Sequence, residues 1–317
     1  MEEYRKISTV GRGQFGSVIL AREVATGDKV AIKVVKTKRY TEKQRADLIR
    51  EVVVLSGVHH PFVVAYRHSF YKAAAVYIVM EYAERGTLKA NLAKDGRKLK
   101  LSERRIMRYF VQILLALMHL HREQILHRDL KTENIFVAAD GSIKLGDFGV
   151  SRVLGNTLAA TRAGTPHYVA PEIADVWSLG VVLYEMVMGK MPFRPRKPGA
   201  GLPQLLDNIL HKQIRVPRSR NVSSSLRNLV SDLLSKDPDD RPSLRSVFKR
   251  SIVRHAFDAL PDREDFDSKG RYAPYDSSEE DEGESASRRG KRDAKKLQKR
   301  LGVSRSSLRL RNLSNLM

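Results

Sequence analysis

The 317-residue chain contains no cysteine, which excludes disulfide bridges and thiolate metal sites. No apolar run approaches the roughly 20 residues that a transmembrane helix needs, and the first residues, Met-Glu-Glu-Tyr-Arg-Lys, do not resemble a signal peptide. These absences predict a soluble cytoplasmic protein without a membrane span. With 42% hydrophobic residues, the chain can bury a substantial core.

Acidic residues are also scarce relative to basic ones, 36 against 58, which leaves a formal net charge of +22. The excess is not confined to one end: residues 262–317 hold 14 Lys and Arg against 11 Asp and Glu, which leaves 44 against 25 in residues 1–261. A basic body favours acidic partners such as tubulin tails, anionic surfaces or nucleic acid. Because charge excess alone speaks only to association and solubility, we do not expect nucleic acid as the primary partner.

The most informative stretch is residues 125–134, Ile-Leu-His-Arg-Asp-Leu-Lys-Thr-Glu-Asn, followed by Leu-Gly-Asp-Phe-Gly at 145–149. Phosphoryl transfer needs a base that orients the attacking hydroxyl, oxygen ligands for Mg²⁺, and cations near the phosphates. Protein kinases supply these with H-R-D-L-x-x-x-N and D-F-G, and both patterns occur here without substitution. An isolated loop Asp or Asn is usually a turn former, but the joint spacing decides against that reading. The predicted roles are base for Asp129, γ-phosphate contact for Lys131, and Mg²⁺ ligands for Asn134 and Asp147.

An independent signal lies near the amino terminus, where residues 11–18 read Gly-Arg-Gly-Gln-Phe-Gly-Ser-Val. A lone G-x-G-x-x-G is weak evidence, because dinucleotide-binding folds use it before a helix. Here the β-rich runs 17–24 and 30–35 follow, separated by a turn, so we predict a hairpin that closes over the phosphates of ATP. The predicted ATP-contacting residues are Val10, Gly11, Arg12, Gly13, Gln14, Phe15, Gly16, Ser17, Val18, Ala31, Lys33, Met80, Glu81 and Ala83.

Lys33 ends the motif Val-Ala-Ile-Lys, which is typical of the strand lysine that contacts the α- and β-phosphates. Residues 47–55 have helical apolar spacing and include Glu51, which we predict to pair with Lys33. The basic residues 36–45 between them are expected to form a solvated connection. The apolar strand 76–80 then leads into residues 81–86, the expected hinge. Met80 would limit the depth of the adenine pocket, although an ordinary core methionine fits the sequence equally well.

Several segments go beyond the general kinase pattern: residues 126–136, 144–154 and 164–172, and His-Ser-Phe at 68–70. With them the chain resembles the NIMA-related (NEK) serine/threonine kinases over about residues 4–255. The resemblance implies an α+β, bilobal protein-kinase fold with a small β-rich N-lobe (about 1–80), a hinge (81–86) and a larger helical C-lobe (87–255).

The same resemblance implies that the chain uses ATP and Mg²⁺ to phosphorylate Ser or Thr hydroxyls of protein substrates. Lys131, two residues after the catalytic Asp, is similar to the lysine of serine/threonine kinases. Roles in the cell cycle, microtubules or cilia are implied, with acidic or microtubule-associated partners and a cytoskeletal location. Thr161 matches the activation-loop phosphorylation site, whose phosphate would pair with Arg128. An exposed loop threonine without a role is the alternative.

One departure from the family pattern lies between Glu172 and Asp175, which are three residues apart rather than about a dozen. Three extended peptide steps span only about 10–11 Å. We therefore expect either the pairing of Glu172 with Arg241 or the bracing of the catalytic loop by Asp175 to be strained or lost. The alternative function is then an ATP-binding but catalytically impaired scaffold, and a gene-model or splice artefact is a competing explanation.

After about residue 261 the composition changes to charge blocks, acidic at 277–284 and basic at 288–300. Such blocks are typical of disordered tails, so we predict that residues 262–317 form a charged, disordered tail. The basic run at 295–301 could serve as a nuclear address or an anionic-surface patch, although most basic runs of this kind are neither. Folding back as a regulator is a further alternative.

Overall fold

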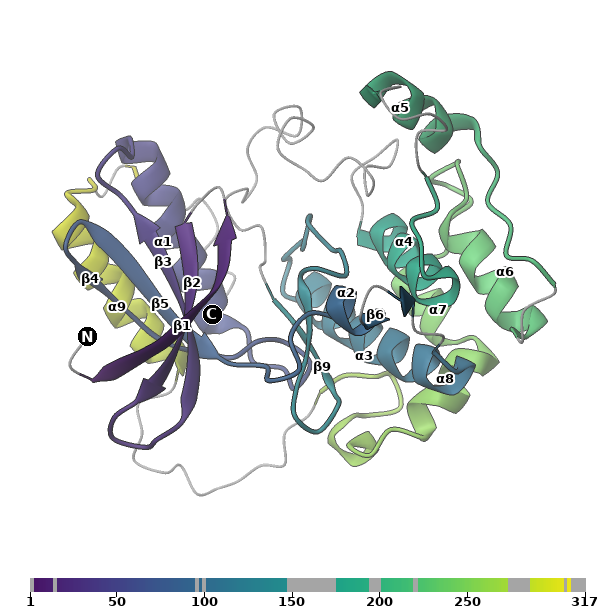
Figure 1. Cartoon of the computed structure of the whole chain (residues 1–317), viewed down its shortest axis with the longest axis horizontal. Coiled ribbons are helices and arrows are strands. Elements are labelled where there is room, and N and C mark those ends of the chain that lie inside the picture. The colour runs from purple at the N-terminus through teal and green to yellow at the C-terminus, as the bar shows by residue number, and fades with distance from the viewer. Residues whose placement is uncertain are drawn as a thin grey trace. The chain divides into compact units, whose positions relative to one another are not determined.

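The computed structural model describes residues 3–13, 16–94, 97–98, 101–146, 175–193, 201–218, 222–272, 286–304 and 307–308 (Figure 1). These residues fall into two compact units. Unit 1 comprises the described residues up to Ala83 together with those from 286 onward, and unit 2 comprises the described residues from Glu84 to 272. The division between Ala83 and Glu84 falls inside the stretch 81–86 that the sequence predicts as the hinge.

Unit 1 is built on a five-stranded antiparallel sheet with the order β1-β2-β3-β5-β4. Alternate side chains of the strands point into a core that includes Ile19, Val30, Ile32 and Val79, as the period of two predicts for strands covered on one face. The β-rich runs predicted at 17–24 and 30–35 are therefore strands. The strands are β1 (Tyr4–Gly13), β2 (Gly16–Glu23), β3 (Lys29–Lys36), β4 (Tyr66–Lys72) and β5 (Ala75–Glu81).

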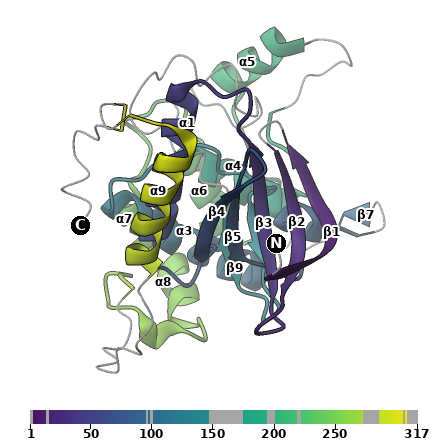
Figure 2. The same ribbon diagram turned by 90° about the vertical axis from the view of Figure 1, so that its left-hand side faces the viewer.

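Helix α1 (Glu42–Gly57) lies against this sheet in unit 1 (Figure 2). It begins earlier than the sequence pattern suggested, because Thr41 and Gln44 form a capping box that satisfies exposed N–H groups of the first turn. The stretch 36–45, expected to be a solvated connection, is thus helical from Glu42. Glu51, expected in a helix, lies in the third turn of α1.

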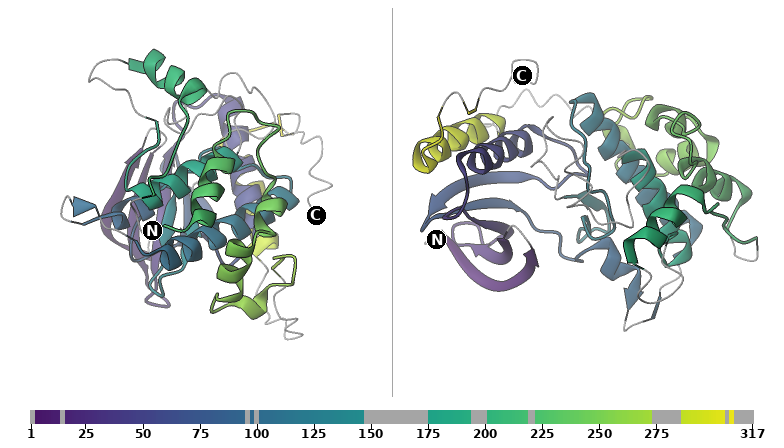
Figure 3. Two further views of the ribbon diagram at one scale, coloured as in Figure 1. Left: turned by 90° about the vertical axis from the view of Figure 1, so that its right-hand side faces the viewer. Right: turned by 90° about the horizontal axis from the view of Figure 1, so that it is seen from above.

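The carboxyl-terminal segment differs from the prediction of a disordered tail. Residues Ala286–Leu301 form helix α9, which packs along α1 and β4 within unit 1 (Figure 2; Figure 3, right). Four positions at helical spacing are buried there: Gly290, Ala294, Leu297 and Leu301. Charge-block composition favoured disorder, but this stripe of small and apolar residues gives the helix a face to bury.

Unit 2 is mainly helical (Figure 3, left). Its central helix α3 (Glu103–Arg122) and the apolar α4 (Asp175–Met188) are largely buried, and Trp177 of α4 stacks on Phe193 at 5.6 Å between ring centroids. The other elements are α2 (Leu88–Asn91), β6 (Ala93–Lys94), β7 (Arg97–Lys98), β8 (Ile135–Val137), β9 (Ile143–Leu145), α5 (Gly201–His211), α6 (Ser224–Leu233), α7 (Leu244–Phe248), α8 (Ser251–Asp258) and a 3₁₀ helix (Arg263–Asp265).

Among the described residues, none of the helices combines the length and the apolar character that crossing a bilayer would require.

Candidate active site

In unit 2, the loop between α3 and β8 brings three predicted residues together. Lys131 Nζ lies 2.9 and 2.7 Å from the two carboxylate oxygens of Asp129, and Asn134 Nδ2 donates to Asp129 Oδ2 at 2.8 Å. Asn134 Nδ2 also donates to the backbone carbonyl of Asp129 at 2.8 Å, which fixes the amide. A carboxylate, an ammonium group and an amide oxygen thus occupy one small region. This set can accept a proton, contact a phosphate and offer oxygen to a hard cation.

Asp175, the first residue of α4, braces this loop from beneath. Its carboxylate accepts hydrogen bonds from the backbone N–H groups of His127 and Arg128, each at 2.8 Å, and lies 2.8 Å from His121 Nε2. Arg128 has a φ of 64°, a left-handed conformation that costs a non-glycine residue about 1–3 kcal/mol. The two charge-assisted hydrogen bonds hold the backbone in that conformation immediately before Asp129.

The ionisation of Asp175 fits this bracing role. Burial alone would raise the pKa of its carboxyl group, but the hydrogen bond from His121, the charge of His127 and the two backbone N–H donors outweigh burial. The net effect is a pKa below the ordinary value. Asp175 therefore stays ionised at neutral pH while it is almost fully buried.

A second support, which the sequence reasoning missed, reaches the loop from the last turn of α4. Thr132 Oγ1 donates to Glu185 Oε2 at 2.8 Å, and Lys89 of α2 pairs with the same carboxylate. Glu185 is buried although it is acidic. Charged residues are rarely buried unless they are paired, so the burial of Glu185 indicates that polar partners surround it. A glutamate in an otherwise apolar helix could have pointed to it.

Of the two residues that flank the shortened connection, Asp175 is among the described residues. Asp175 makes its full set of contacts with the catalytic loop, so this anchor is intact. Glu172 lies outside the described residues. Arg241 donates to the carbonyls of Ser235 and Lys236 and stacks over Trp177 at 5.0 Å. The described residues therefore do not favour the impaired scaffold over a working kinase.

In unit 1, Lys33 of β3 and Glu51 of α1 form the predicted ion pair. Lys33 Nζ lies 2.9 Å from Glu51 Oε1, and the two side chains are only 21% and 11% exposed. Partial burial weakens solvent screening, so the pair holds the Lys33 ammonium group in one place more firmly than a surface pair would.

The glycine-rich turn also belongs to unit 1. Gly13 and Gly16 pair across the end of the β1–β2 hairpin. Gly16 has a φ of 150°, and a Cβ added there would lie closer than 3.0 Å to the carbonyl oxygen of Val34. Only glycine fits, so the backbone can run close to β3 at this point. Gln14 and Phe15, predicted ATP contacts, lie outside the described residues.

The remaining predicted ATP contacts lie on strands of the same sheet or just after it. Ala31 and Met80 are directly paired across β3 and β5, and Val18 faces Lys33 across β2 and β3. The N–H of Glu81 donates to the carbonyl of Ala65 at 2.9 Å, so a backbone contact from Glu81 to adenine must come through its carbonyl. Val10 is 49% exposed, as a residue at the mouth of a binding site can be.

Asp147 and Thr161 also lie outside the described residues. Among the described residues, no cluster of three or more His, Asp or Glu side chains is arranged to hold a metal ion. Asn134 fits the predicted Mg²⁺ role, because its Nδ2 is committed to Asp129 and its Oδ1 is the hard oxygen that Mg²⁺ prefers. The N–H of Gly146, next to Asp147 in the chain, donates to the Asn134 carbonyl at 3.0 Å and ties the two motifs together.

Comparison with known proteins decides the family. The protein kinase domain family matches residues 4–253, and serine/threonine-protein kinase nekl-2 of Caenorhabditis elegans is 38% identical over 273 residues, covering 80% of this chain and 75% of the relative. The chain is a NEK-family protein kinase. Serine/threonine-protein kinase Nek1 of Mus musculus is 38% identical over 264 residues, 80% of this chain and 21% of the relative. Nek5 of Homo sapiens is 38% identical over 267 residues, 80% of this chain and 37% of the relative.

This chain thus spans a fifth to three eighths of the length of Nek1 and Nek5, whose additional parts it does not match. The resemblance to NEK kinases and the expected fold class are confirmed, with a β-rich N-lobe in unit 1 and a helical C-lobe in unit 2. Kinases of this family use ATP and Mg²⁺ and act on protein substrates, and the NEK relatives are named as serine/threonine kinases. The individual roles of the site residues remain predictions.

Proposed function

We propose that this NEK-family chain transfers the γ-phosphoryl group of ATP to Ser or Thr hydroxyls of proteins. The observation that carries the proposal is the cluster of Asp129, Lys131 and Asn134, with its backbone held from beneath by Asp175. Positioning and electrostatic stabilisation supply most of the rate in this chemistry. A carboxylate fixed by two side-chain donors and a braced backbone meets that requirement.

Each residue has a role that follows from its chemistry. Asp129 orients the acceptor hydroxyl and takes up its proton, while Lys131 offers positive charge beside the transferred group. Lys33, held by Glu51, contacts the α- and β-phosphates, and the backbone of the β1–β2 turn approaches the phosphates closely because Gly16 has no side chain.

The nucleotide and metal would be held by the residues predicted from the sequence. When bound, Mg²⁺ neutralises the charge that develops on the phosphate oxygens. Asn134 offers an amide oxygen for this cation, and Asp147 is proposed as its second ligand. Thr161 is proposed as the activation-loop site at which phosphorylation would order its segment by pairing with Arg128.

The test is phosphate transfer from radiolabelled ATP to a basic protein substrate and to the chain itself. Replacing Asp129→Asn should lower kcat by about 10²–10⁴-fold, because it removes the base while keeping the shape. Asp140→Asn is the matched control, since this aspartate lies in the β8–β9 turn, outside the catalytic loop, and accepts hydrogen bonds from the N–H and hydroxyl groups of Ser142. Equal rates for wild type and Asp129→Asn would exclude the proposed role, and absence of transfer by folded wild type would favour the scaffold.

We further propose acidic protein partners, including microtubule-associated ones, and a cytoplasmic or cytoskeletal location with roles in the cell cycle, microtubules or cilia. The net charge of +22 supports acidic partners, and NEK membership supports the cellular role. A nuclear address in the basic residues 295–301 is the alternative location. Binding to tubulin should weaken with salt, whereas comparable or tighter binding to DNA would instead favour nucleic acid as the main partner.

A further inference from the structure

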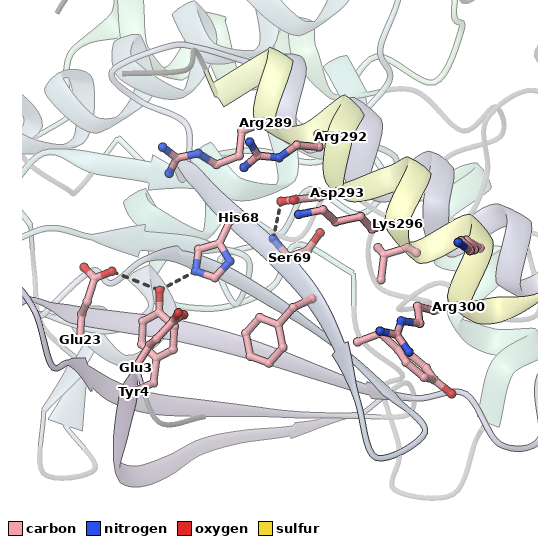
Figure 4. Close-up of a pocket in the computed structure, with 14 residues that line it drawn as sticks. Glu3, Tyr4, Glu23, His68, Ser69, Arg289, Arg292, Asp293, Lys296 and Arg300 are labelled. Carbon is pink, nitrogen blue, oxygen red and sulfur yellow. Dashed lines mark hydrogen bonds between the residues drawn. The ribbon is translucent and has the colours of Figure 1, made fainter. Parts of the chain in front are cut away.

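Helix α9 is held to unit 1 by a buried carboxylate. Asp293, which is 5% exposed, accepts a hydrogen bond from the backbone N–H of Ser69 at 2.9 Å and another from Tyr66 Oη at 2.8 Å (Figure 4 shows the Asp293–Ser69 contact). Both partners are on β4, which lies at one edge of the sheet. Edge strands present unpaired N–H groups, and Asp293 satisfies one of them. Burial raises the pKa of Tyr66, so its hydroxyl remains a donor.

A close approach of α9 to α1 gives the second contact. Gly290 of α9 lies against Ser56 of α1, and a Cβ added to Gly290 would come closer than 3.0 Å to both the Oγ and the Cβ of Ser56. Ser56 is itself buried, with its hydroxyl donating to the carbonyl of Val53 at 2.8 Å. The two helices are therefore in backbone-to-side-chain contact, which only glycine permits at position 290.

The residues at and after the end of α9 contact the first half of α1. Arg45 donates to the carbonyl of Leu301 at 2.9 Å, and Glu42 accepts hydrogen bonds from the Ser304 N–H at 3.0 Å and the Ser307 hydroxyl at 2.7 Å. Leu297 and Leu301, at 1% and 4% exposure, fill the interface between these polar ends. Contacts thus run along α1 from Glu42 to Ser56.

Glu51 lies on the opposite side of α1 from this interface. It follows Glu42 by nine residues, which is about 2.5 turns of an α-helix, so the two side chains point in opposite directions. Helix α1 therefore has α9 on one side and the Lys33–Glu51 ion pair on the other. A helix in this position cannot shift away from β3 without disrupting its interface with α9.

We infer that α9 is a positioning element for the kinase reaction, which keeps α1 where Glu51 can pair with Lys33, and that Gly290 and Asp293 are the positioning residues that seat it. The inference rests on the proposed kinase function. Helix α9 packs on α1 and β4, so its effect on the reaction would pass through α1. Helix α9 comes from the carboxyl-terminal end of the chain, beyond the stretch that matches the protein kinase domain.

The test uses a matched pair of glycines in the full chain. Gly290→Ala introduces the clash with Ser56 but favours helix formation in α9 itself. Gly57→Ala, at the end of α1, adds a Cβ that meets nothing within 4 Å. We expect Gly290→Ala to lower kcat/KM for ATP by about tenfold or more, and Gly57→Ala to leave it unchanged. Unchanged kcat/KM in Gly290→Ala would overturn the inference.

Two further variants separate positioning from general damage. Gly290→Ala combined with Ser56→Gly restores the space, so its kcat/KM should return to that of Ser56→Gly alone. In a Glu51→Gln background, where the ion pair is already lost, Gly290→Ala should cause no further loss, because both changes act on one interaction. A loss of kcat/KM that Ser56→Gly does not rescue would overturn the inference. So would an equal loss caused by Gly290→Ala in the Glu51→Gln background.

Hydrogen exchange distinguishes failure of the inference from failure of the kinase proposal. If folded wild type transfers no phosphate, the proposed function is wrong, but amide exchange still reports on α1. Faster exchange throughout α1 in Gly290→Ala, and not in Gly57→Ala, supports positioning by α9. Exchange in α1 that is the same in both variants as in wild type overturns it.

Discussion

The two halves of the proposed kinase site are supported in different ways. In unit 2, the Asp129 loop is held by Asp175, which lies within 50 residues in the chain and belongs to the kinase pattern. In unit 1, Glu51 of the Lys33–Glu51 pair lies on α1, whose other side is covered by α9, more than 200 residues away in the sequence. The first support is intrinsic to the kinase domain, and the second is added by this chain's carboxyl-terminal segment.

The two supports differ in how readily they can be altered, and this distinguishes support of the catalytic chemistry from support through which the activity can be regulated. Support that comes from within the catalytic motifs is costly to withdraw, because Asp175 is almost fully buried against the loop. Support from a terminal helix can be altered by changes at the helix surface, which leave the kinase core untouched. Helix α9 is the part of the molecule through which the activity could be tuned.

The largest effect is expected from Asp175→Ala. This change leaves the N–H groups of His127 and Arg128 without their carboxylate acceptor and removes the brace from the left-handed Arg128, so the free energy of unfolding should fall by about 3–5 kcal/mol and transfer should be lost. Urea denaturation and a transfer assay measure the two effects. An activity that survives in folded Asp175→Ala would break the comparison, because the loop would then not depend on its nearby anchor.

A smaller effect on stability, but a clear one on activity, is expected from Glu51→Gln. The two side chains are mostly buried, but glutamine keeps an oxygen that can accept from Lys33 Nζ, so loss of the charge should cost about 1–2 kcal/mol of stability. The kcat/KM for ATP should nevertheless fall by about 10–100-fold, because Lys33 loses the group that orients it. Steady-state kinetics and thermal melting distinguish these outcomes, and a loss of stability as large as that in Asp175→Ala would contradict the account.

In α9, Asp293→Ala should destabilise unit 1 by about 1–3 kcal/mol, because the Ser69 N–H loses its acceptor in a buried place. Asp293→Asn is the matched control, since its amide oxygen can still accept from Ser69. Exchange of the Ser69 amide, followed by mass spectrometry or NMR, should be faster only in the alanine variant. Equal exchange in wild type and both variants would show that Asp293 does not seat α9.

The smallest effect concerns pH. Hydrogen bonds from Ser307 and Ser304 lower the pKa of Glu42 from 4.5 to about 2. Because the folded-state pKa is the lower one, the contribution of Glu42 to docking of the α9 end is present above pH 4.5 and is lost as the pH falls toward 2. Glu42→Gln should remove this acid dependence of amide protection in residues 301–304. An unchanged dependence in that variant would assign it to another group.

Much of the fold and the catalytic loop could be predicted from the sequence, because residues such as Asp129 and Asn134 lie at a fixed spacing within one loop. Local motifs impose local geometry, and the Lys33–Glu51 pairing followed from a strand and a helix that are neighbours in the chain. The brace from Glu185 was missed, because a single glutamate in an apolar helix does not reveal which loop it will meet.

Helix α9 could not be predicted in the same way. Its sequence is dominated by Lys and Arg, which is typical of disordered tails, and its buried stripe from Gly290 to Leu301 is too sparse to indicate a core helix by itself. The stripe has a place to bury only because α1 and the edge strand β4 form a surface for it. That surface exists in the folded unit and not in any local pattern of residues.

The most direct test of the central claim is the identity of the phosphorylated amino acid. Purified wild type and Asp129→Asn would be incubated with labelled ATP, Mg²⁺ and a basic protein substrate, and the product would be hydrolysed and resolved into phosphoserine, phosphothreonine and phosphotyrosine. The account predicts phosphoserine or phosphothreonine with wild type, and almost none with Asp129→Asn. Phosphotyrosine as the main product, or no product from folded wild type, would contradict it.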